Sequence, residues 1–264
     1  MASLTLLAEC QYYRAVAHLD HLVISVRDLD EAAARWQKVT GIKFARGGRH
    51  PGGTGNCIGV LHDQEAYLEL ITVVDRSSMD GWAVLARDRV GPLSWAIGTD
   101  DLDRDVEELA AQGVTVGEVA NGSRNCPDGT TITWRWSIVG EPGAASWPFL
   151  IEWPTSGPTR LGVTASSADV RLSAVTVRVP DPGDLAAALT GALGFSWCER
   201  GPDGDSETVV TDGEVTVILI PAGYGPVGPV SLRLRRNEPA EQEAQDPELL
   251  DGILINVQAE QAPA

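Results

Sequence analysis

Two glutamates of this chain stand in apolar runs that are typical of strands. Glu69 lies in the run Tyr-Leu-Glu-Leu-Ile at 67–71, and Glu152 lies in Phe-Leu-Ile-Glu-Trp at 149–153. A carboxylate is costly to bury in such surroundings unless it is paired, protonated or bound to a metal. Alternation along a strand provides a harmless alternative, because it can turn either glutamate outward into solvent. Both positions are therefore candidates for acid–base or metal chemistry.

A histidine in a shaped loop is the third candidate. His50 stands in Gly-Gly-Arg-His-Pro at 47–51, where the glycines and the proline favour a turn. Imidazole titrates near neutral pH and can act as a general base. The neighbouring Arg49 is suited to clamp a substrate carboxylate or phosphate, and Asn56, at the start of the next strand, can hydrogen-bond a substrate. An exposed turn with incidental charges is the alternative.

Tryptophans are concentrated in the middle of the chain. Trp134 and Trp136 are two residues apart on one predicted strand, so they share a face. If that face lines a concave sheet, the two indoles form a pocket for a planar or apolar ligand. Packing between a helix and a sheet is the alternative. Glycine-rich segments here lack the strand–turn–helix context of a phosphate-binding loop, so no nucleotide cofactor is expected.

The elements that must position these side chains recur along the sequence. Strand-like segments at 19–26, 93–99 and 174–179 each lead into a short amphipathic helix that stops at a glycine: Gly41, Gly113 and Gly194. Three strand-like runs follow each helix: 42–46, 56–61 and 67–74, then 114–119, 130–138 and 149–153, then 195–199, 207–211 and 215–220. The pattern of each unit is β-α-β-β-β.

We therefore predict an α+β fold of repeated β-α-β-β-β modules that form cupped mixed sheets. Residues 18–155 hold two complete modules, 156–169 form a linker rich in small and polar residues, and 170–258 hold one complete and one degraded module. Residues 1–17 are an N-terminal extension. A doubly wound parallel sheet also alternates strands and helices, but runs of three consecutive strands do not suit it.

Composition narrows the partners. The 264 residues carry a net charge of −17, which argues against binding to nucleic acid and to anionic membranes. The four cysteines show no Cys-x-x-Cys spacing, which is typical of a reduced, cytoplasmic protein. The first residues lack the basic and apolar regions of a signal peptide. A small-molecule ligand and a cytoplasmic location are expected.

Residues 18–155 resemble the vicinal oxygen chelate superfamily and, more narrowly, the glyoxalase-like domain family. The segments that carry the resemblance are 19–21, 47–56, 67–71, 123–129 and 148–153. The resemblance implies that two modules curl around a cupped sheet and hold a divalent metal between their first and fourth strands. The repeated modules at 170–258 show a weaker similarity.

Mapped residue by residue, the resemblance implies His21, Glu69 and Glu152 as metal ligands. The remaining position is Ser94, which precedes Asp101 by seven residues as His21 precedes Asp28; serine is a poor ligand, and His50 could replace it. The third module has Ala174 and about Ile218 at these positions and cannot bind metal. One imidazole and two carboxylates suit Zn, Mn, Fe, Ni or Co. The pocket is expected to include these residues: Asn56, Ser94, Arg124, Trp134 and Trp136.

Two functions are consistent with these residues. The first is a metal-dependent lyase or isomerase that acts on a small oxygenated metabolite, with His50 and Arg49 as catalytic residues. The second is a metal-free protein that sequesters a drug or metabolite, which Ser94 and the tryptophans favour. Extradiol cleavage is disfavoured because such enzymes use two histidines and one carboxylate. The C-terminal half is expected to serve a homodimer or to cover exposed sheet edges.

Overall fold

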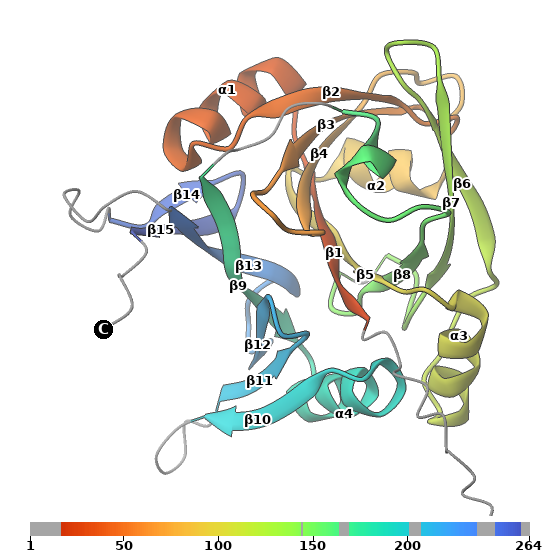
Figure 1. The fold of residues 1–264 in the computed structure, drawn as a ribbon, viewed down its shortest axis with the longest axis vertical. Coiled ribbons are helices and arrows are strands. Elements are labelled where there is room, and N and C mark those ends of the chain that lie inside the picture. Colours follow the sequence, from red (N-terminus) through yellow and green to blue (C-terminus); the bar gives the residue numbers. More distant parts are fainter. Residues whose placement is uncertain (1–16, 144, 164–168, 201–206, 237–245, 260–264) are drawn as a thin grey trace, which may run out of the picture.

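The computed structural model describes residues 17–259, apart from 144, 164–168, 201–206 and 237–245. Two sheets make up the fold (Figure 1). One is a closed barrel with the strand order β1-β4-β3-β2-β6-β7-β8-β5, and the other is a sheet of seven strands, β10-β11-β12-β9-β13-β15-β14. The α+β class with cupped sheets is confirmed. The predicted extension at 1–17 lies outside the described residues, apart from its last one.

The barrel is built from the first two modules. The first comprises β1 (His18–Ser25), α1 (Leu29–Thr40), β2 (Phe44–Arg49), β3 (Thr54–Val60) and β4 (Tyr67–Val73). The second comprises β5 (Gly91–Gly98), α3 (Leu102–Ala111), β6 (Ala120–Asn125), β7 (Thr131–Ile138) and β8 (Phe149–Glu152). In each module the first strand pairs in parallel with the fourth, and β1 joins β5 in antiparallel fashion.

Local sequence explains where the long helices begin. The side chain of Asp28 accepts a hydrogen bond from the Glu31 backbone N–H and caps α1. Asp101 caps α3 in the same way through the Arg104 N–H. Helix α1 ends at Gly41, whose φ of 79° is the left-handed conformation that glycine adopts readily. Asp28 and Asp101 therefore mark equivalent positions of the two modules.

Two local expectations need correction. The predicted strand at 114–119 is absent from the described structure, where Val116 forms an isolated bridge with Val139 and the strand β6 begins at Ala120. A short helix between the modules, α2 (Gly81–Asp88), is not among the predicted elements. Its N-cap is Asp80, which accepts from the Ala83 N–H. The polarity of the flanking segment, Asp-Arg-Ser-Ser at 75–78, hides this helix in the sequence.

The seven-stranded sheet repeats the module. It contains β9 (Val170–Val179), α4 (Pro182–Leu193), β10 (Ser196–Arg200), β11 (Glu207–Thr211), β12 (Thr216–Pro221), β13 (Gly228–Arg236), β14 (Glu248–Leu250) and β15 (Ile253–Ala259). Strand β9 pairs in parallel with β12 and antiparallel with β13, as β1 does with β4 and β5. The helix region predicted to be degraded, 237–247, falls largely outside the described residues.

Apolar residues fuse the two sheets into one core. A single cluster runs from Leu22, Trp36 and Trp95 in the barrel to Val175 and Leu232 in the seven-stranded sheet. Polar contacts reinforce it: Asp251 accepts from the indole of the fully buried Trp36 and from the Arg35 guanidinium, both at 2.8 Å.

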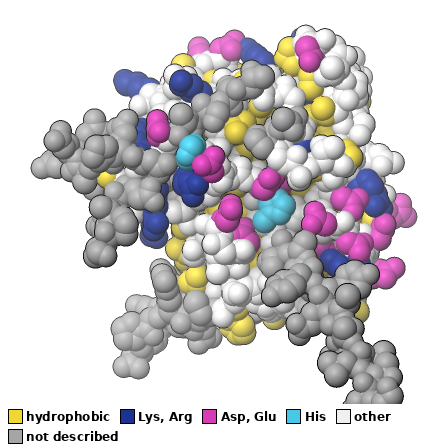
Figure 2. Space-filling view, viewed as in Figure 1, with side chains coloured by type: hydrophobic (Ala, Val, Ile, Leu, Met, Phe, Trp, Pro, Cys, Tyr) yellow, Lys and Arg dark blue, Asp and Glu magenta, His cyan; other side chains and the backbone are white. Residues whose placement is uncertain are grey.

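Acidic side chains gather with arginine over α3 on the outer surface (Figure 2).

Replacing Asp251 tests this junction. Asp251→Ala leaves the buried Trp36 N–H without an acceptor, and it places alanine at a φ of 44°. We expect the free energy of unfolding to fall by about 1–3 kcal/mol. Asp251→Asn keeps an acceptor oxygen and tolerates the left-handed backbone, so its loss should be smaller. Urea denaturation checks both, and equal stability of Asp251→Ala and wild type would contradict the assignment.

Candidate active site

The barrel encloses a cavity of about 220 Å³. Apolar clusters close it from two sides. On one side α2 packs Ala86 against Val23, Leu93 and Ile151. On the other side Leu161, from the short 3-10 helix η1 (Pro158–Leu161), packs against Ile58 and Tyr67. Strands β2 and β6 meet through a single pair, Arg49 and Asn125. Polar groups are therefore held in a sheltered space between the two modules.

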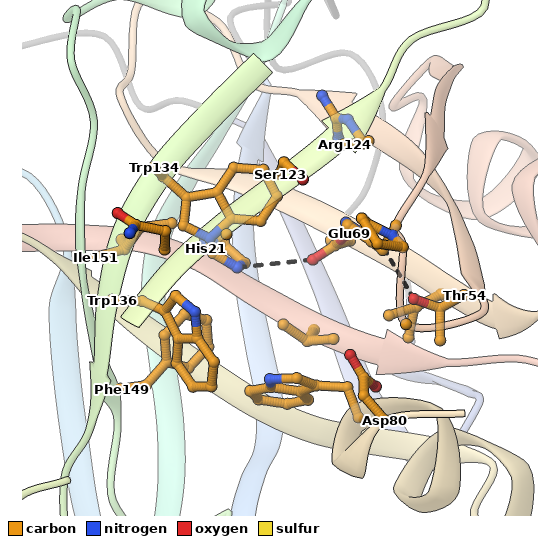
Figure 3. Close-up of a pocket in the computed structure, with 18 of the residues that line it drawn as sticks. His21, Thr54, Glu69, Asp80, Ser123, Arg124, Trp134, Trp136, Phe149 and Ile151 are labelled. Atoms are coloured by element: carbon orange, nitrogen blue, oxygen red, sulfur yellow. Dashed lines mark hydrogen bonds and ion pairs between the residues drawn. The ribbon is translucent and has the colours of Figure 1, made fainter. Parts of the chain in front are cut away.

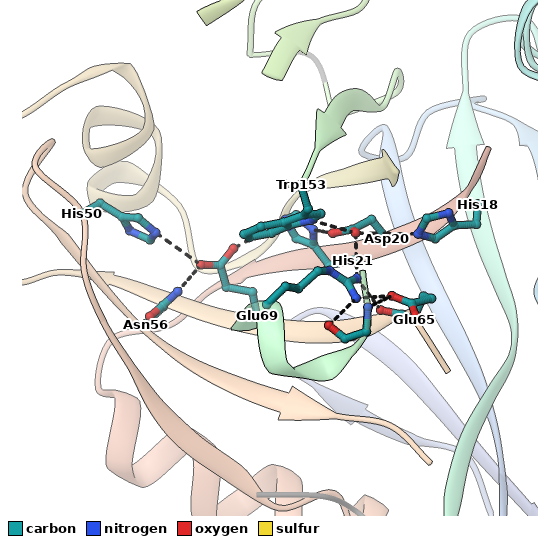
Figure 4. Close-up of polar contacts among 10 residues, drawn as sticks. His18, Asp20, His21, His50, Asn56, Glu65, Glu69 and Trp153 are labelled. Carbon is teal, nitrogen blue, oxygen red and sulfur yellow. Dashed lines mark hydrogen bonds and ion pairs between the residues drawn. The ribbon is translucent and has the colours of Figure 1, made fainter. Parts of the chain in front are cut away.

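A carboxylate lies at the centre of the cavity wall. Glu69 on β4 is 7% exposed, and its Oε1 accepts a hydrogen bond of 2.5 Å from the Asn56 amide. The Nε2 of His21 lies 3.7 Å from Oε2, and the Nε2 of His50 lies 3.8 Å from Oε1. The carboxylate therefore stands between two imidazoles, each beside a different oxygen (Figure 4). A pocket-facing acid with two titratable neighbours can accept or return a proton.

His21 is oriented by a buried acid from its own strand. Its Nδ1 lies 2.5 Å from Oδ1 of Asp20, which leaves Nε2 facing the cavity. The pairing of β1 with β5 skips Asp20, so this residue is the extra one of a β-bulge. Asp20 is fully buried, and its Oδ2 accepts from Arg160 at 3.0 Å and from the Trp153 indole at 3.1 Å. The network reaches Glu65 through Arg160 (Figure 4).

The charge of Asp20 follows from these contacts. Burial by itself raises the pKa of this carboxyl, but the hydrogen bond to His21 and the positive charges around it outweigh that effect and lower the pKa. Asp20 is therefore ionised over the physiological range. The Asp20 carboxylate beside Nδ1 of His21 keeps a proton on that nitrogen and fixes the orientation of the His21 ring.

His50 is held from the loop side. Its Nδ1 lies 2.8 Å from the Thr54 hydroxyl, and the two residues also share a backbone hydrogen bond. Burial lowers the pKa of His50, the Arg124 charge lowers it further, and the nearby Glu69 carboxylate opposes both. The net shift is downward, so the imidazole is neutral at pH 7.

The opposite wall of the cavity is aromatic. Trp134 and Trp136 from β7, Phe149 from β8 and Trp153 line it, together with Trp82 from α2. Figure 3 shows Trp134, Trp136 and Phe149 on the same side as His21, which contacts Phe149 edge-on with ring centroids 5.3 Å apart, while Glu69 lies on the other side. The first module thus contributes the buried acid and both imidazoles, and the second contributes flat apolar surface together with Arg124 on β6.

The structure places Glu152 away from this cavity, which corrects its predicted role as a metal ligand. Its carboxylate accepts from the backbone N–H of Leu102, at the start of α3, and from Arg135. The strand register gives the reason. Val23, two residues after His21, pairs with Glu69; Ala96, two residues after Ser94, pairs with Phe149. Glu152 is three residues further along and points to the other face.

The same register locates the remaining equivalents. In the third module Thr176, two residues after Ala174, pairs with Ile218, as the mapping predicts. Ser94 borders a second cavity rather than the one that holds Glu69. The second module therefore carries a serine and a phenylalanine where the first carries His21 and Glu69.

Other predicted residues are divided between the cavity and the surface. Arg124, Trp134 and Trp136 line the cavity, and Asn56 lies behind Glu69 as its donor. Arg124 is 3% exposed; it donates to the Leu161 carbonyl, and its Nε has no partner among the described residues. Arg49, predicted as catalytic, is exposed where β2 pairs with β6. It follows that His50 enters the site without its neighbour.

The predicted metal site does not fit this arrangement. Two of its three ligands, His21 and Glu69, face each other, but the third lies across the sheet. No group of three His, Cys, Asp or Glu side chains suited to a metal occurs within the described part of the chain. His50 does not complete the set, because it approaches Glu69 from the side opposite His21. The site therefore consists of one carboxylate, Glu69, with an imidazole on each side.

Several residues of the site are not among those predicted from the sequence. Asp20, Thr54, Tyr67 and Asp80 reach the site or support it, as does Arg160 from the segment predicted as a linker. The pair Asp20-His21 is the available signal, because an acid beside a strand histidine is a common orienting partner. Arg160 offers none: it contacts Asp20 from 140 residues away along the chain.

The closed barrel of paired β-α-β-β-β modules, with a cavity between them, is the architecture of the vicinal oxygen chelate superfamily. A family model described as a glyoxalase-like domain matches residues 19–193, so the chain belongs to the glyoxalase-like domain family. The match continues beyond the barrel through β9 and α4. Among curated proteins, none matches this chain significantly.

Solved structures share the fold at low sequence identity. A hypothetical protein from Staphylococcus aureus has a TM-score of 0.74 at 15% identity, covering 93% of this chain and 100% of that one. 2,2',3-Trihydroxybiphenyl 1,2-dioxygenase from Sphingomonas wittichii strain RW1 gives 0.55 at 13%, covering 93% and 91%. A variant of 4-hydroxymandelate synthase from Streptomyces coelicolor gives 0.51 at 14%, covering 85% and 72%. These likenesses establish the architecture. Helices in the described residues are too short or too polar to span a membrane.

The lowered pKa of His50 predicts a pH dependence of stability. An unfolded chain binds a proton at this histidine near pH 6.5, whereas the native protein resists it, so stability falls as the pH drops below about 6.5. His50→Gln should weaken this fall between about pH 7.5 and 5.5, measured by urea denaturation. His62→Gln, beside Asp63 near the surface, is the control for loss of a histidine. An unchanged slope in His50→Gln would refute the assignment.

Proposed function

We propose that this protein is an enzyme of the lyase or isomerase type that moves a proton on a small oxygenated molecule, with Glu69 as the base. The observation that supports the proposal most strongly is the Glu69 carboxylate, which faces the barrel cavity between His21 and His50. Glu69 is 7% exposed, and one of its oxygens accepts a hydrogen bond from the Asn56 amide, which fixes the carboxylate toward the cavity.

Each step can be assigned to a group of this chain. Glu69 removes a proton from a carbon next to a carbonyl, and the bonding electrons move onto the carbonyl oxygen. His50, neutral with its Nδ1 beside the Thr54 hydroxyl, offers an Nε2 proton toward the cavity. The Arg124 guanidinium lines the same cavity and opposes the negative charge that develops on the oxygen. Return of the proton yields an isomer; loss of a leaving group yields a lyase product.

The remaining residues position these groups. Asn56 holds one oxygen of Glu69, and Asp20 keeps the His21 ring aimed at the other. Burial raises the pKa of Tyr67 well above its ordinary value, so its ring, stacked on His21 at 4.5 Å, stays neutral. The aromatic wall binds the apolar part of the substrate and excludes water.

A divalent metal belongs to the function expected from the sequence, and the described side chains do not offer its three ligands. We therefore assign the proton transfer to the side chains themselves. After dialysis against EDTA, we expect the protein still to catalyse the exchange of a substrate proton next to a carbonyl for deuterium. Loss of activity in EDTA, reversed by Zn²⁺ or Mn²⁺, would contradict this assignment and restore the metal-dependent alternative; plasma emission spectrometry of the dialysed protein confirms that the metal was removed.

Deuterium exchange tests the base even where the product is not identified. A panel of 2-hydroxy ketones, 2-oxo acids and 2-hydroxy aldehydes is incubated in D₂O, and loss of the proton next to the carbonyl is followed by NMR. The wild type should accelerate exchange of at least one class. Glu69→Gln should reduce the rate at least about 100-fold, the usual effect of removing a general base.

Glu152→Gln is the matched control, because it makes the same change on the outer face of β8. We expect it to retain near-wild-type exchange once its folding is verified by circular dichroism. An active Glu69→Gln protein, or equal losses in both variants, would disprove the role of Glu69.

A second candidate function is the sequestration of a small molecule without turnover. The aromatic wall favours it, since four tryptophans and Phe149 border a cavity of this size. Binding is followed by the quenching of tryptophan fluorescence. A ligand that binds tightly and equally well to wild type and Glu69→Gln, and undergoes neither deuterium exchange nor conversion, would favour sequestration over catalysis.

A further inference from the structure

A second cavity adjoins the first. Its volume is about 480 Å³, and it lies between α2, β5 and the segment that follows β7. Its walls are mainly apolar and include these residues, none of which borders the first cavity: Val84, Leu85, Leu93, Val139, Trp147 and Pro148. Ser94, Asp80 and Glu141 are its main polar groups. It is therefore suited to hydrocarbon or aromatic matter.

Three aromatic rings separate the two cavities. Trp82, Trp136 and Phe149 border both of them. The ring centroids are 5.4 Å apart for Trp82 and Phe149, 6.2 Å for Trp82 and Trp136, and 6.3 Å for Trp136 and Phe149. Two of these contacts are edge-to-face and the third is tilted, so the rings form a packed partition between the two cavities. A ligand in one cavity lies next to the rings that line the other.

The internal repeat links the second cavity to the first. His21 and Glu69 face the first cavity, and their register equivalents in the second module, Ser94 and Phe149, both border the second cavity. The same two positions of the module thus shape both spaces. Their chemistry has changed from an imidazole and a carboxylate to a hydroxyl and a phenyl ring.

We propose that the two cavities bind one amphipathic substrate: its oxygenated head lies at Glu69, and an aromatic or acyl arm crosses the ring partition into the second cavity. The assignment of the head rests on the proposed function; the assignment of the arm rests on the second cavity. The larger cavity is the apolar one, so most of the substrate is hydrocarbon. Trp82, on α2, is the partition ring that does not belong to a strand.

A homologous series of straight-chain 2-oxo acids, from about three to about ten carbons, tests the arm. Binding is measured by calorimetry and by quenching of tryptophan fluorescence. Each methylene that enters an apolar cavity should tighten binding by roughly fourfold until the space is filled. Short members should bind weakly, and the longest members at least about 100-fold more tightly.

Two variants locate the gain. Val84→Trp, on the exposed side of the second cavity, and Ser94→Phe, on its inner side, should each remove the gain with chain length and leave the affinity for the shortest acid unchanged. Val90→Trp is the matched control, because Val90 is similarly exposed and borders neither cavity. Using two variants guards against one that fails to fold.

The outcomes separate this proposal from the proposed function. Affinity that does not rise with chain length, a rise that persists in both filled variants, or no binding by any member would overturn the two-cavity substrate. A chain-length gain that disappears in the filled variants supports it, even where Glu69→Gln leaves deuterium exchange unchanged and so disproves the catalytic role of Glu69.

Discussion

The buried carboxylate of Asp20 is the constraint on which the site depends. An ion inside a protein costs several kcal/mol unless donors surround it. Asp20 draws these donors from three parts of the chain: His21 beside it, Trp153 after β8, and Arg160 in η1. One charge therefore orients the His21 imidazole, binds the Trp153 indole, and fastens the segment after the second module across the barrel. Asp20 is the extra residue of a β-bulge, and its carboxylate lies 2.5 Å from Nδ1 of the neighbouring His21.

The two modules share a backbone and differ in chemistry. In the first, two equivalent positions on the first and fourth strands hold His21 and Glu69; in the second they hold Ser94 and Phe149. This asymmetry explains why the metal site implied by the resemblance is incomplete among the described residues. A symmetric centre needs ligands from both modules, and the second module provides rings. What it provides instead is a dry surface opposite a buried acid, which strengthens electrostatic interactions in the cavity.

Much of the fold could be predicted from the residues. The module pattern follows from Asp28 and Asp101, which cap helices in matching places, and from the glycine that ends α1. The placement of His21 and Glu69 on adjacent strands follows from the same pattern. The short helix α2 did not follow from the module pattern, because it lies between the two modules, spans only eight residues and has Arg89 rather than a glycine at its C-cap.

The errors at the site have a common physical cause. Strand side chains alternate, so a miscount of one residue reverses the face. Glu152 and Glu69 stand in similar apolar segments, but the pairing of β5 with β8 places Phe149 at the position equivalent to Glu69. Arg49 and His50 are neighbours, and one faces solvent while the other faces the cavity. Arg160 shows a different limit: long-range ion pairs with Asp20 and Glu65 leave no local trace in a sequence.

The division of labour between the modules has an evolutionary consequence. His21 and Glu69 lie on β1 and β4, whereas Trp134, Trp136 and Phe149, which shape the ligand space, lie on β7 and β8. Mutations in the latter strands can therefore retune which molecules are accepted while the reactive apparatus is preserved. A lineage built on this plan can diversify its metabolite repertoire by drift in one half of a duplicated scaffold.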